Sequence, residues 1–349
     1  MAALRYAWQR ARMALALGAL GLGTSAVGED AAGLAEALRT ATGAPAVGVG
    51  LSRAGRVDIG VAGLTRPDGS AQVAVEDPWH VGSLTKAMTA TLAARLVEAG
   101  QISWDDPVAE HLPDLVPDGS PYAGVRLTDL LAHRSGLPAN LERPGDLGDG
   151  APARRRYASD ILRQPPDGTT YSNAGYVVAA AMMEAATGTA WETLIAREVF
   201  APLGIGSAGF GAPPRPFGHR TGVWGQPVPV QPGPAADNIP ALGPAGRVHL
   251  TIADLLAFGE AHLTRRDDIL SAASWDRLQT PVEGTSYALG WVVPRAGILG
   301  HDGSNTLWLA RILIDRPRET VIVLVSNWGN IRVQTEAFDQ MVRRILEGP

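Results

Sequence analysis

The chain has 349 residues, of which 46% are hydrophobic and 19% charged, and a formal net charge of −5. This apolar fraction excludes a disordered chain, and the acidic balance argues against nucleic-acid binding, which needs clustered positive charge. The sequence holds no cysteine, which excludes disulfides, thiolate nucleophiles and zinc–thiolate sites. Its one basic cluster is Arg154-Arg155-Arg156, which we expect in a solvated loop.

The first 28 residues have the pattern of a secretory signal peptide. Arg5, Arg10 and Arg12 precede an apolar run from Met13 to Leu22, and small residues follow. That run is too short to span a bilayer, which needs about 20 residues. We therefore expect an exported protein, periplasmic or secreted, with no stable membrane insertion after signal cleavage. An uncleaved anchor is the alternative.

Hydrophobic spacing predicts helices and strands in the N-terminal part of residues 29–349. The expected elements are a helix Glu29–Thr40, a hairpin of strands Ala46–Ser52 and Arg56–Ala62, and a long helix Ser83–Glu98 that ends at Gly100.

The middle of the chain is predicted to be mostly helical, because residues that cap helices precede apolar stretches. Thr128 caps a helix Asp129–His133, Asn173 caps Gly175–Thr187, Thr189 and Glu192 form a capping box for a helix to Val199, and Thr251 caps a helix to about His262. Residues 211–245 are rich in proline and glycine and predict a long structured loop.

Strands return near the C-terminus, followed by a last helix. We expect strands Tyr287–Val293, Ile298–Gly303, Thr306–Ile314 and Thr320–Ser326, and a helix Val333–Leu346. Strands at both ends with helices between them indicate one α+β domain whose sheet is built from both termini. The sheet-bearing lobe takes about 29–104 and 246–349, and a helical lobe of about 105–245 is inserted.

Lys86 is the only lysine among 30 basic residues, so every other positive side chain is arginine. Arginine keeps its proton in a protein, whereas a buried lysine can lose it and act as a base. Ser83 stands three residues earlier, at the start of the predicted helix, so both side chains share one face. A serine hydroxyl becomes a nucleophile when a neighbouring base takes its proton. The alternative is a plain helix cap beside an exposed lysine.

Two further segments offer polar groups for catalysis. Tyr171 can relay a proton and Asn173 can orient a substrate or Lys86, although a capping asparagine beside a packed tyrosine is the ordinary explanation. His301 and Gly303 end a predicted strand, where glycine permits close approach of a substrate and the N–H of Ser304 offers an oxyanion donor. A surface turn is the alternative there.

Other catalytic patterns are missing from the sequence. It contains no Gly-x-Ser-x-Gly, so a nucleophile elbow is unsupported. Its seven histidines show no metal-binding spacing, and neither a metal nor another cofactor is expected.

The motifs Ser83-x-x-Lys86, Tyr171-x-Asn173 and His301-x-Gly303, in this order, resemble the serine β-lactamase and penicillin-binding-protein-like hydrolases, most nearly the class C arrangement. Further segments of the sequence are similar to this family too, at residues 81–87, 105–108, 130–137 and 244–246. The resemblance covers about residues 44–345. It implies an antiparallel sheet flanked by helices, a mostly helical lobe and a site between them.

The resemblance also implies roles for the site residues. Ser83 would be acylated and Lys86 would activate it, while Tyr171 would share the acid–base work. Asn173 would bind the substrate or Lys86. The backbone N–H groups of Ser83 and Ser304 would form the oxyanion hole.

The third motif departs from the antibiotic-hydrolysing members. These carry Lys-Thr-Gly, in which the lysine meets the substrate carboxylate, whereas His-x-Gly is usual among the peptidases, amidases and esterases of the fold. We expect Asp302 to repel an anionic substrate further. Trp224, Trp291 and Trp308 suggest an apolar, stacking cleft, with core packing as the alternative for each.

Three functional hypotheses follow. The first is an exported serine hydrolase that cuts an ester, amide or D-amino-acid peptide bond through an acyl-enzyme on Ser83. The second is a β-lactamase or D,D-carboxypeptidase of the cell envelope, and the third is a non-catalytic binding protein of the same fold. The expected partner is a small-molecule or peptide substrate, and the sequence carries no signal for an oligomeric state.

Overall fold

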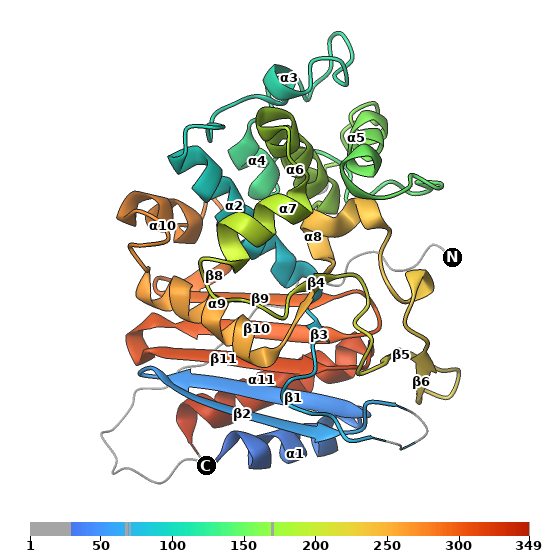
Figure 1. Cartoon of the computed structure of the whole chain (residues 1–349), viewed down its shortest axis with the longest axis vertical. Coiled ribbons are helices and arrows are strands. Elements are labelled where there is room, and N and C mark those ends of the chain that lie inside the picture. The colour runs from blue at the N-terminus through green and yellow to red at the C-terminus, as the bar shows by residue number, and fades with distance from the viewer. Residues whose placement is uncertain (1–28, 67–68, 70, 169–170, 349) are drawn as a thin grey trace.

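A six-stranded antiparallel sheet lies in the lower half of the protein, as Figure 1 draws it, in the computed structural model, which describes residues 29–348 except 67, 68, 70, 169 and 170. The strand order is β2-β1-β11-β10-β9-β8. Their bounds are β1 Ala46–Arg53, β2 Arg56–Gly63, β8 Val292–Arg295, β9 Ile298–Ser304, β10 Leu309–Asp315 and β11 Thr320–Ser326. Because β1 pairs with β11, one sheet is built from both ends of the chain, as the sequence predicts.

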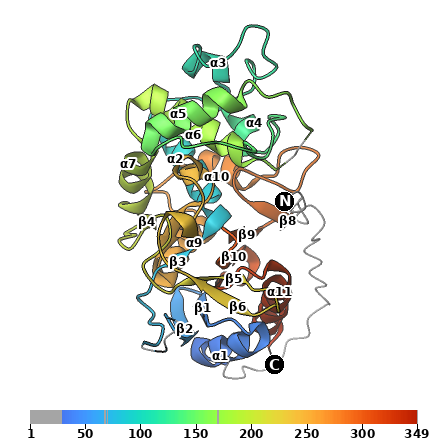
Figure 2. The same cartoon turned by 90° about the vertical axis from the view of Figure 1, so that its right-hand side faces the viewer.

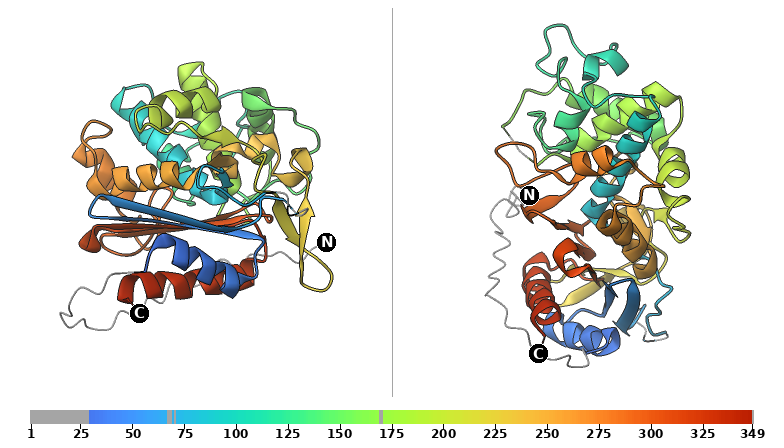
Figure 3. Two further views of the ribbon diagram at one scale, coloured as in Figure 1. Left: turned by 60° about the horizontal axis from the view of Figure 1, so that its bottom comes forward. Right: turned by 90° about the vertical axis from the view of Figure 1, so that its left-hand side faces the viewer.

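The sequence of β1 shows why the sheet has two different faces. Val47, Val49 and Leu51 point to one face and pack with α1 (Ala31–Thr42) and α11 (Ile331–Glu347). Gly48 and Gly50 point to the other, where α9 (Ile252–Thr264) lies so close that a Cβ on either would be 2.4 Å from Ile252. Alternation along the strand therefore sorts the helices to the two faces (Figure 3).

The remaining helices gather on the far side of α9 from α1 and α11 (Figure 2). They are α2 Thr85–Glu98, α3 Val108–His111, α4 Leu127–Leu131, α5 Gly150–Ile161, α6 Asn173–Thr187, α7 Trp191–Ile195, α8 Gly243–Gly246 and α10 Ala272–Gln279. The expected α+β class, with an antiparallel sheet flanked by helices and a mostly helical part, is confirmed.

The basic cluster is not a solvated loop. It lies on α5, and the Arg154 side chain is fully buried, where its guanidinium bonds both Glu184 and Glu192. The guanidinium fork matches carboxylates bidentately, which explains an arginine at this buried position.

Two predicted caps are also wrong. The N-cap of α4 is Arg126, where Asp129 receives the backbone N–H, and that of α7 is Ala190 without a side-chain bond. Glu192 cannot complete a capping box because it pairs with Arg154. Thr251 does cap α9, as expected.

The proline- and glycine-rich segment 211–245 holds more structure than a loop. It contains a hairpin of β5 (Gly218–Thr221) and β6 (Pro227–Val230) and two 3₁₀ turns, Pro234–Ala236 and Pro240–Leu242. Two short strands, β3 (Trp79–His80) and β4 (Gly209–Phe210), pair with β7 (Val248–Leu250).

Within the described residues, no helix is both long and apolar enough to cross a bilayer. The predicted signal peptide, residues 1–28, lies outside the described residues.

Candidate active site

Ser83 lies on a 3₁₀ turn, Gly82–Leu84, that runs directly into α2, rather than on the helix itself. The turn is pressed against the end of β9. A Cβ on Gly303 would lie 2.0 Å from the Val81 carbonyl oxygen and 2.6 Å from the Ser83 nitrogen. Gly303, which we expected to permit close approach of a substrate, therefore lets β9 approach the turn that carries Ser83.

Lys86 lies one turn along, with a fully buried side chain. Its Nζ is 3.0 Å from Ser83 Oγ, 2.7 Å from Asn173 Oδ1 and 2.6 Å from the Ala245 carbonyl oxygen. The predicted serine–lysine pair is thus in hydrogen-bond contact, and a third predicted residue, Asn173, joins it from α6.

The surroundings of Lys86 favour its neutral form. Burial lowers the pKa of the amine well below its ordinary value of 10.5. Two of its three partners are carbonyl oxygens, which only accept, and the third is a hydroxyl, which can also donate. A neutral amine can therefore donate to Asn173 and Ala245 while its lone pair accepts the proton of Ser83. This is the arrangement of a general base beside a nucleophile.

The helix cap next to this site is Ser172, not Asn173. Ser172 Oγ accepts from Gly175 N at 3.1 Å, so the Asn173 amide is left to bind Lys86. Its Nδ2 donates to Asn140 Oδ1 at 3.0 Å, which fixes which end of the amide faces Lys86. Asn140 was not among the predicted site residues, since nothing in its local sequence pattern marks it.

Tyr171 packs between the lysine and a histidine. Its ring centre is 4.9 Å from Lys86 Nζ and 4.2 Å from the ring of His133. His133 Nδ1 accepts from Ser172 N at 3.0 Å, so this imidazole holds the backbone of the second motif. Burial lowers the pKa of His133 well below 6.5. Residues 130–137 were part of the family resemblance, but they did not predict that His133 binds the backbone of Ser172.

The third motif is held by Tyr287. The Tyr287 hydroxyl lies 3.2 Å from His301 Nε2, and His301 Nδ1 lies 2.6 Å from the Asp302 carbonyl oxygen. A carbonyl only accepts, so Nδ1 carries the proton and Nε2 accepts from tyrosine. Burial lowers the pKa of His301 to about 4. His301 is therefore neutral near pH 7 and supplies no positive charge.

Asp302 does not face the site, contrary to our expectation. It pairs in register with Arg311 on the face of the sheet that holds α11, and Arg311 donates to it at 2.6 and 2.7 Å. Arg311 is 2% exposed and also bonds Asp339 of α11. The strand alternates, so His301 and Gly303 point to the opposite face. The carboxylate is neutralised there and does not repel a substrate.

Removal of this carboxylate is a test of that orientation. The change Asp302→Ala leaves Arg311 buried with one partner fewer, so we expect the free energy of unfolding to fall by about 3 kcal/mol. The ratio of kcat/KM for a carboxylate-bearing and a neutral substrate should stay the same. Denaturant unfolding and paired kinetics check this, and a rise in relative activity on the anionic substrate would contradict it.

The proposed stacking cleft is wrong for all three tryptophans. Trp291 and Trp308 are fully buried in the core. Trp224 is 90% exposed at the tip of the β5–β6 hairpin, beside an equally exposed Val223. The hairpin stands at the edge of the molecule (Figure 3).

Trp224 is therefore not expected to bind the reacting group. We predict that Trp224→Ala changes kcat/KM for a small ester by less than about twofold and leaves the melting temperature unchanged, because the side chain buries almost no surface. Steady-state kinetics and thermal unfolding provide the check. A tenfold loss would place the hairpin tip at the substrate.

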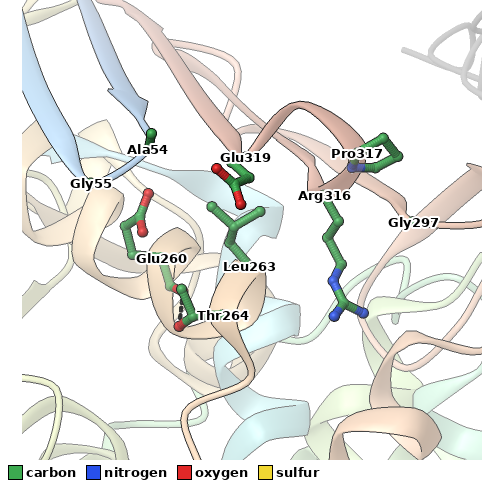
Figure 4. Close-up of a pocket in the computed structure, with 9 residues that line it drawn as sticks. All are labelled: Ala54, Gly55, Glu260, Leu263, Thr264, Gly297, Arg316, Pro317 and Glu319. Atoms are coloured by element: carbon green, nitrogen blue, oxygen red, sulfur yellow. Dashed lines mark hydrogen bonds between the residues drawn. The ribbon is translucent and has the colours of Figure 1, made fainter.

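Other hollows and ligand clusters lie apart from these residues. A hollow of about 680 Å³ lies between the β1–β2 turn, α9 and the β10–β11 turn, lined by Glu260, Arg316 and Glu319 among others (Figure 4). The hollow is lined by Gly297, which directly precedes β9, whereas Ser304 is the last residue of β9. The hollow and Ser304 therefore lie at opposite ends of this strand. Among the described residues, Asp106, Glu110 and His111 could hold a metal ion, and none is a predicted site residue.

Sequence comparisons identify the family of the chain. The sequence profile of the family described as Beta-lactamase matches residues 31–341. Penicillin-binding protein 4 of Amycolatopsis lactamdurans is 28% identical over 341 residues, which span 89% of this chain and 87% of that protein. The D-alanyl-D-alanine-carboxypeptidase/endopeptidase AmpH of Escherichia coli strain K12 is 24% identical over 264 residues, 67% of this chain and 66% of AmpH. The chain spans 48% to 65% of the length of three further relatives.

A solved structure matches the fold as well. The class C beta lactamase of Rhodobacter sphaeroides superimposes with a TM-score of 0.74 at 22% identity, over 90% of this chain and 99% of that one. The family profile covers nearly all of the described residues, and the serine and lysine of the first motif are in contact at the end of the sheet. The chain therefore belongs to the beta-lactamase family and is a serine hydrolase of that family.

Proposed function

We propose that the protein hydrolyses an ester, amide or D-amino-acid peptide bond through an acyl-enzyme on Ser83. The observation that carries this proposal is the contact of Lys86 Nζ with Ser83 Oγ at 3.0 Å, inside a set of partners that a neutral amine satisfies. No carboxylate stands among the hydrogen-bond partners that the described residues give to Lys86, so its charge is not held in place by an ion pair.

The reaction takes place in two steps. Ser83 Oγ attacks the carbonyl carbon as its proton moves to Lys86, and the tetrahedral oxyanion accepts hydrogen bonds from the N–H groups of Ser83 and Ser304. Lys86, together with Tyr171, returns that proton to the leaving alcohol or amine. Water then attacks the ester on Ser83, gives a proton to the same base and releases the acid with Ser83 restored.

The third motif supports substrates that are uncharged where they meet β9. His301 is neutral, and the Asp302 carboxylate is paired on the far face of the sheet. A substrate anchored by a carboxylate would find no lysine at this motif, since Lys86 is the only lysine in the chain. An ester, an amide or an internal peptide bond satisfies this condition.

The second candidate is a β-lactamase or D,D-carboxypeptidase of the cell envelope. It is favoured by the names of two relatives, a penicillin-binding protein and a D-alanyl-D-alanine-carboxypeptidase/endopeptidase. Membership of a hydrolase family favours either enzyme over a non-catalytic binding protein.

The test compares the protein without residues 1–28 and its Ser83→Ala variant on a p-nitrophenyl ester, a D-amino-acid amide and a chromogenic cephalosporin. We expect ester or amide turnover that Ser83→Ala lacks, with an acyl group on the Ser83 peptide by mass spectrometry. Fast cephalosporin hydrolysis would favour the second candidate. Equal turnover by Ser83→Ala would refute the acyl-enzyme.

Export is part of the same proposal. The charged start and apolar run of residues 1–28 support it, as does the likeness to penicillin-binding proteins. The mature N-terminus, sequenced from periplasm or medium, should begin near residue 27 or 29, after Ala26 or Gly28. An intact Met1 in the cytoplasm would exclude export.

A further inference from the structure

Asp237 is the centre of a buried polar cluster directly behind the turn that carries Ser83. Its carboxylate is 1% exposed. Oδ1 lies 2.9 Å from His80 Nε2 and accepts from Asn305 Nδ2 at 3.0 Å, and Oδ2 accepts from Arg247 Nε at 2.9 Å. We name these four residues the Asp237 cluster. They come from four separate segments, so the cluster joins parts of the chain that are far apart in sequence.

The first arm of the cluster runs through His80 to the nucleophile. His80 Nδ1 accepts from Gly82 N at 3.1 Å, and Gly82 directly precedes Ser83. Because Nδ1 accepts, the imidazole proton sits on Nε2, which faces Asp237. The ring is fully buried and stacks on Trp308 at 5.6 Å. The charge of the Asp237 carboxylate, 2.9 Å from Nε2, favours this tautomer, in which His80 accepts from the peptide next to Ser83.

The second arm runs through Asn305 to the end of β9. Asn305 directly follows Ser304, and its Nδ2 also donates to the Ala236 carbonyl oxygen at 3.1 Å. Its Oδ1 accepts from Leu307 N and Trp308 N, at 3.2 and 3.3 Å. The side chain therefore fixes the turn between β9 and β10 immediately after Ser304.

The two arms meet at the candidate oxyanion hole. A Cβ on Gly82 would lie 2.3 Å from Ser304 N, so the backbones that the arms hold are in direct contact. Stabilisation of an oxyanion depends on donors fixed in advance at hydrogen-bond distance from the charge that develops. One carboxylate therefore contacts both side chains, His80 and Asn305, that bond the two backbones.

We propose that Asp237, acting through His80 and Asn305, is a positioning residue that aligns the N–H groups of Ser83 and Ser304 for the oxyanion. This inference rests on the proposed acyl-enzyme mechanism. It assigns a role to the proline- and glycine-rich segment 211–245, which brings Asp237 to the back of the site.

The test uses Asp237→Asn, which keeps the shape of the side chain but removes its charge, and Asp237→Ala. Rates are measured on the ester per active site, counted by the burst of p-nitrophenol, so that unfolded protein does not contribute. We expect kcat to fall by about tenfold for Asp237→Asn and about 100-fold for Asp237→Ala, with KM changed by less than about threefold. Phenylboronic acid, whose adduct with serine is tetrahedral, should bind more weakly by a similar factor.

His80 variants test the chain of contacts. His80→Asn keeps an acceptor near the position of Nδ1 for Gly82 but cannot reach Asp237, whereas His80→Ala has neither. We expect kcat to decrease from wild type to His80→Asn to His80→Ala. Equal losses for the two variants would mean that the bond to Gly82 is irrelevant and would overturn this arm.

A matched control separates positioning from stability. Glu192→Gln removes a charge from the buried Arg154 pair in the helical part of the protein, so it should lower the melting temperature without changing kcat per active site. If the Asp237 variants behave in this way too, with full kcat and unchanged boronic acid affinity, the inference is wrong while the acyl-enzyme stands. Turnover by Ser83→Ala would instead refute the proposed function itself.

Discussion

Lys86→Arg should abolish turnover about as completely as Ser83→Ala. Arginine keeps its proton at any pH that a protein survives, so it cannot take the proton of Ser83. A general base contributes about 10²- to 10⁴-fold to the rate, and the loss should lie at the upper end because the base also activates the nucleophile. Pre-steady-state acylation of Ser83, followed by mass spectrometry, measures the effect.

The pH dependence provides the second part of this test. The active form is the neutral amine, so kcat/KM rises with pH as Lys86 loses its proton. Because burial lowers the pKa of Lys86 well below 10.5, the rise should be complete well below pH 10. An acid limb centred near the ordinary lysine pKa would contradict a buried base, as would appreciable acylation by Lys86→Arg.

The second large effect on activity is expected when one methyl group is added at Gly303. In Gly303→Ala the new Cβ would lie 2.0 Å from the Val81 carbonyl oxygen and 2.6 Å from the Ser83 nitrogen. Both are backbone atoms, which cannot rotate away as a side chain can. The end of β9 must therefore move from the turn that carries Ser83. We expect kcat/KM to fall about 100-fold and the free energy of unfolding to fall by about 2 kcal/mol.

Two other glycines serve as controls. A Cβ on Gly60 would lie 2.1 Å from the Ala31 carbonyl oxygen, between β2 and α1, so Gly60→Ala should destabilise the protein but leave kcat of the folded enzyme intact. Gly124 has no atom within 4 Å of such a Cβ, and Gly124→Ala should change neither quantity. An active Gly303→Ala would show that the two oxyanion donors need no close contact.

The parts of this protein that local spacing determines were predicted well from the sequence. The hairpin of β1 and β2, α9 with its Thr251 cap and strands β9, β10 and β11 follow from alternation, helical periodicity and capping. The predicted strand Tyr287–Val293 is wrong in its bounds, since β8 covers Val292–Arg295. The contact of Ser83 with Lys86 follows from their separation by three residues and from the single lysine.

Two of the errors concern polar side chains whose partners come from distant parts of the chain. Asn173 fits a cap by its position, yet Ser172 takes that role because Lys86, 87 residues away, binds the asparagine amide. The sequence around Arg154 predicts a solvated side chain, whereas in the structure this arginine pairs with Glu184 and Glu192. Spacing contains no information about such pairs, since it describes only neighbours on one element. The roles of all the site residues stay predictions: Ser83, Lys86, Tyr171, Asn173, His301, Gly303 and Ser304.

The pairing of β1 with β11 also has a consequence for the order of folding. The partner of β1 lies about 270 residues downstream, so the sheet cannot close until β11 has been synthesised. Contacts between such distant residues carry a high loop-closure cost and slow folding. The helices α4 and α5 both pack on α6 over shorter separations in sequence, and these three can form earlier. Ser83 precedes that insertion and Ser304 follows it, so the site is completed only when the last strands arrive.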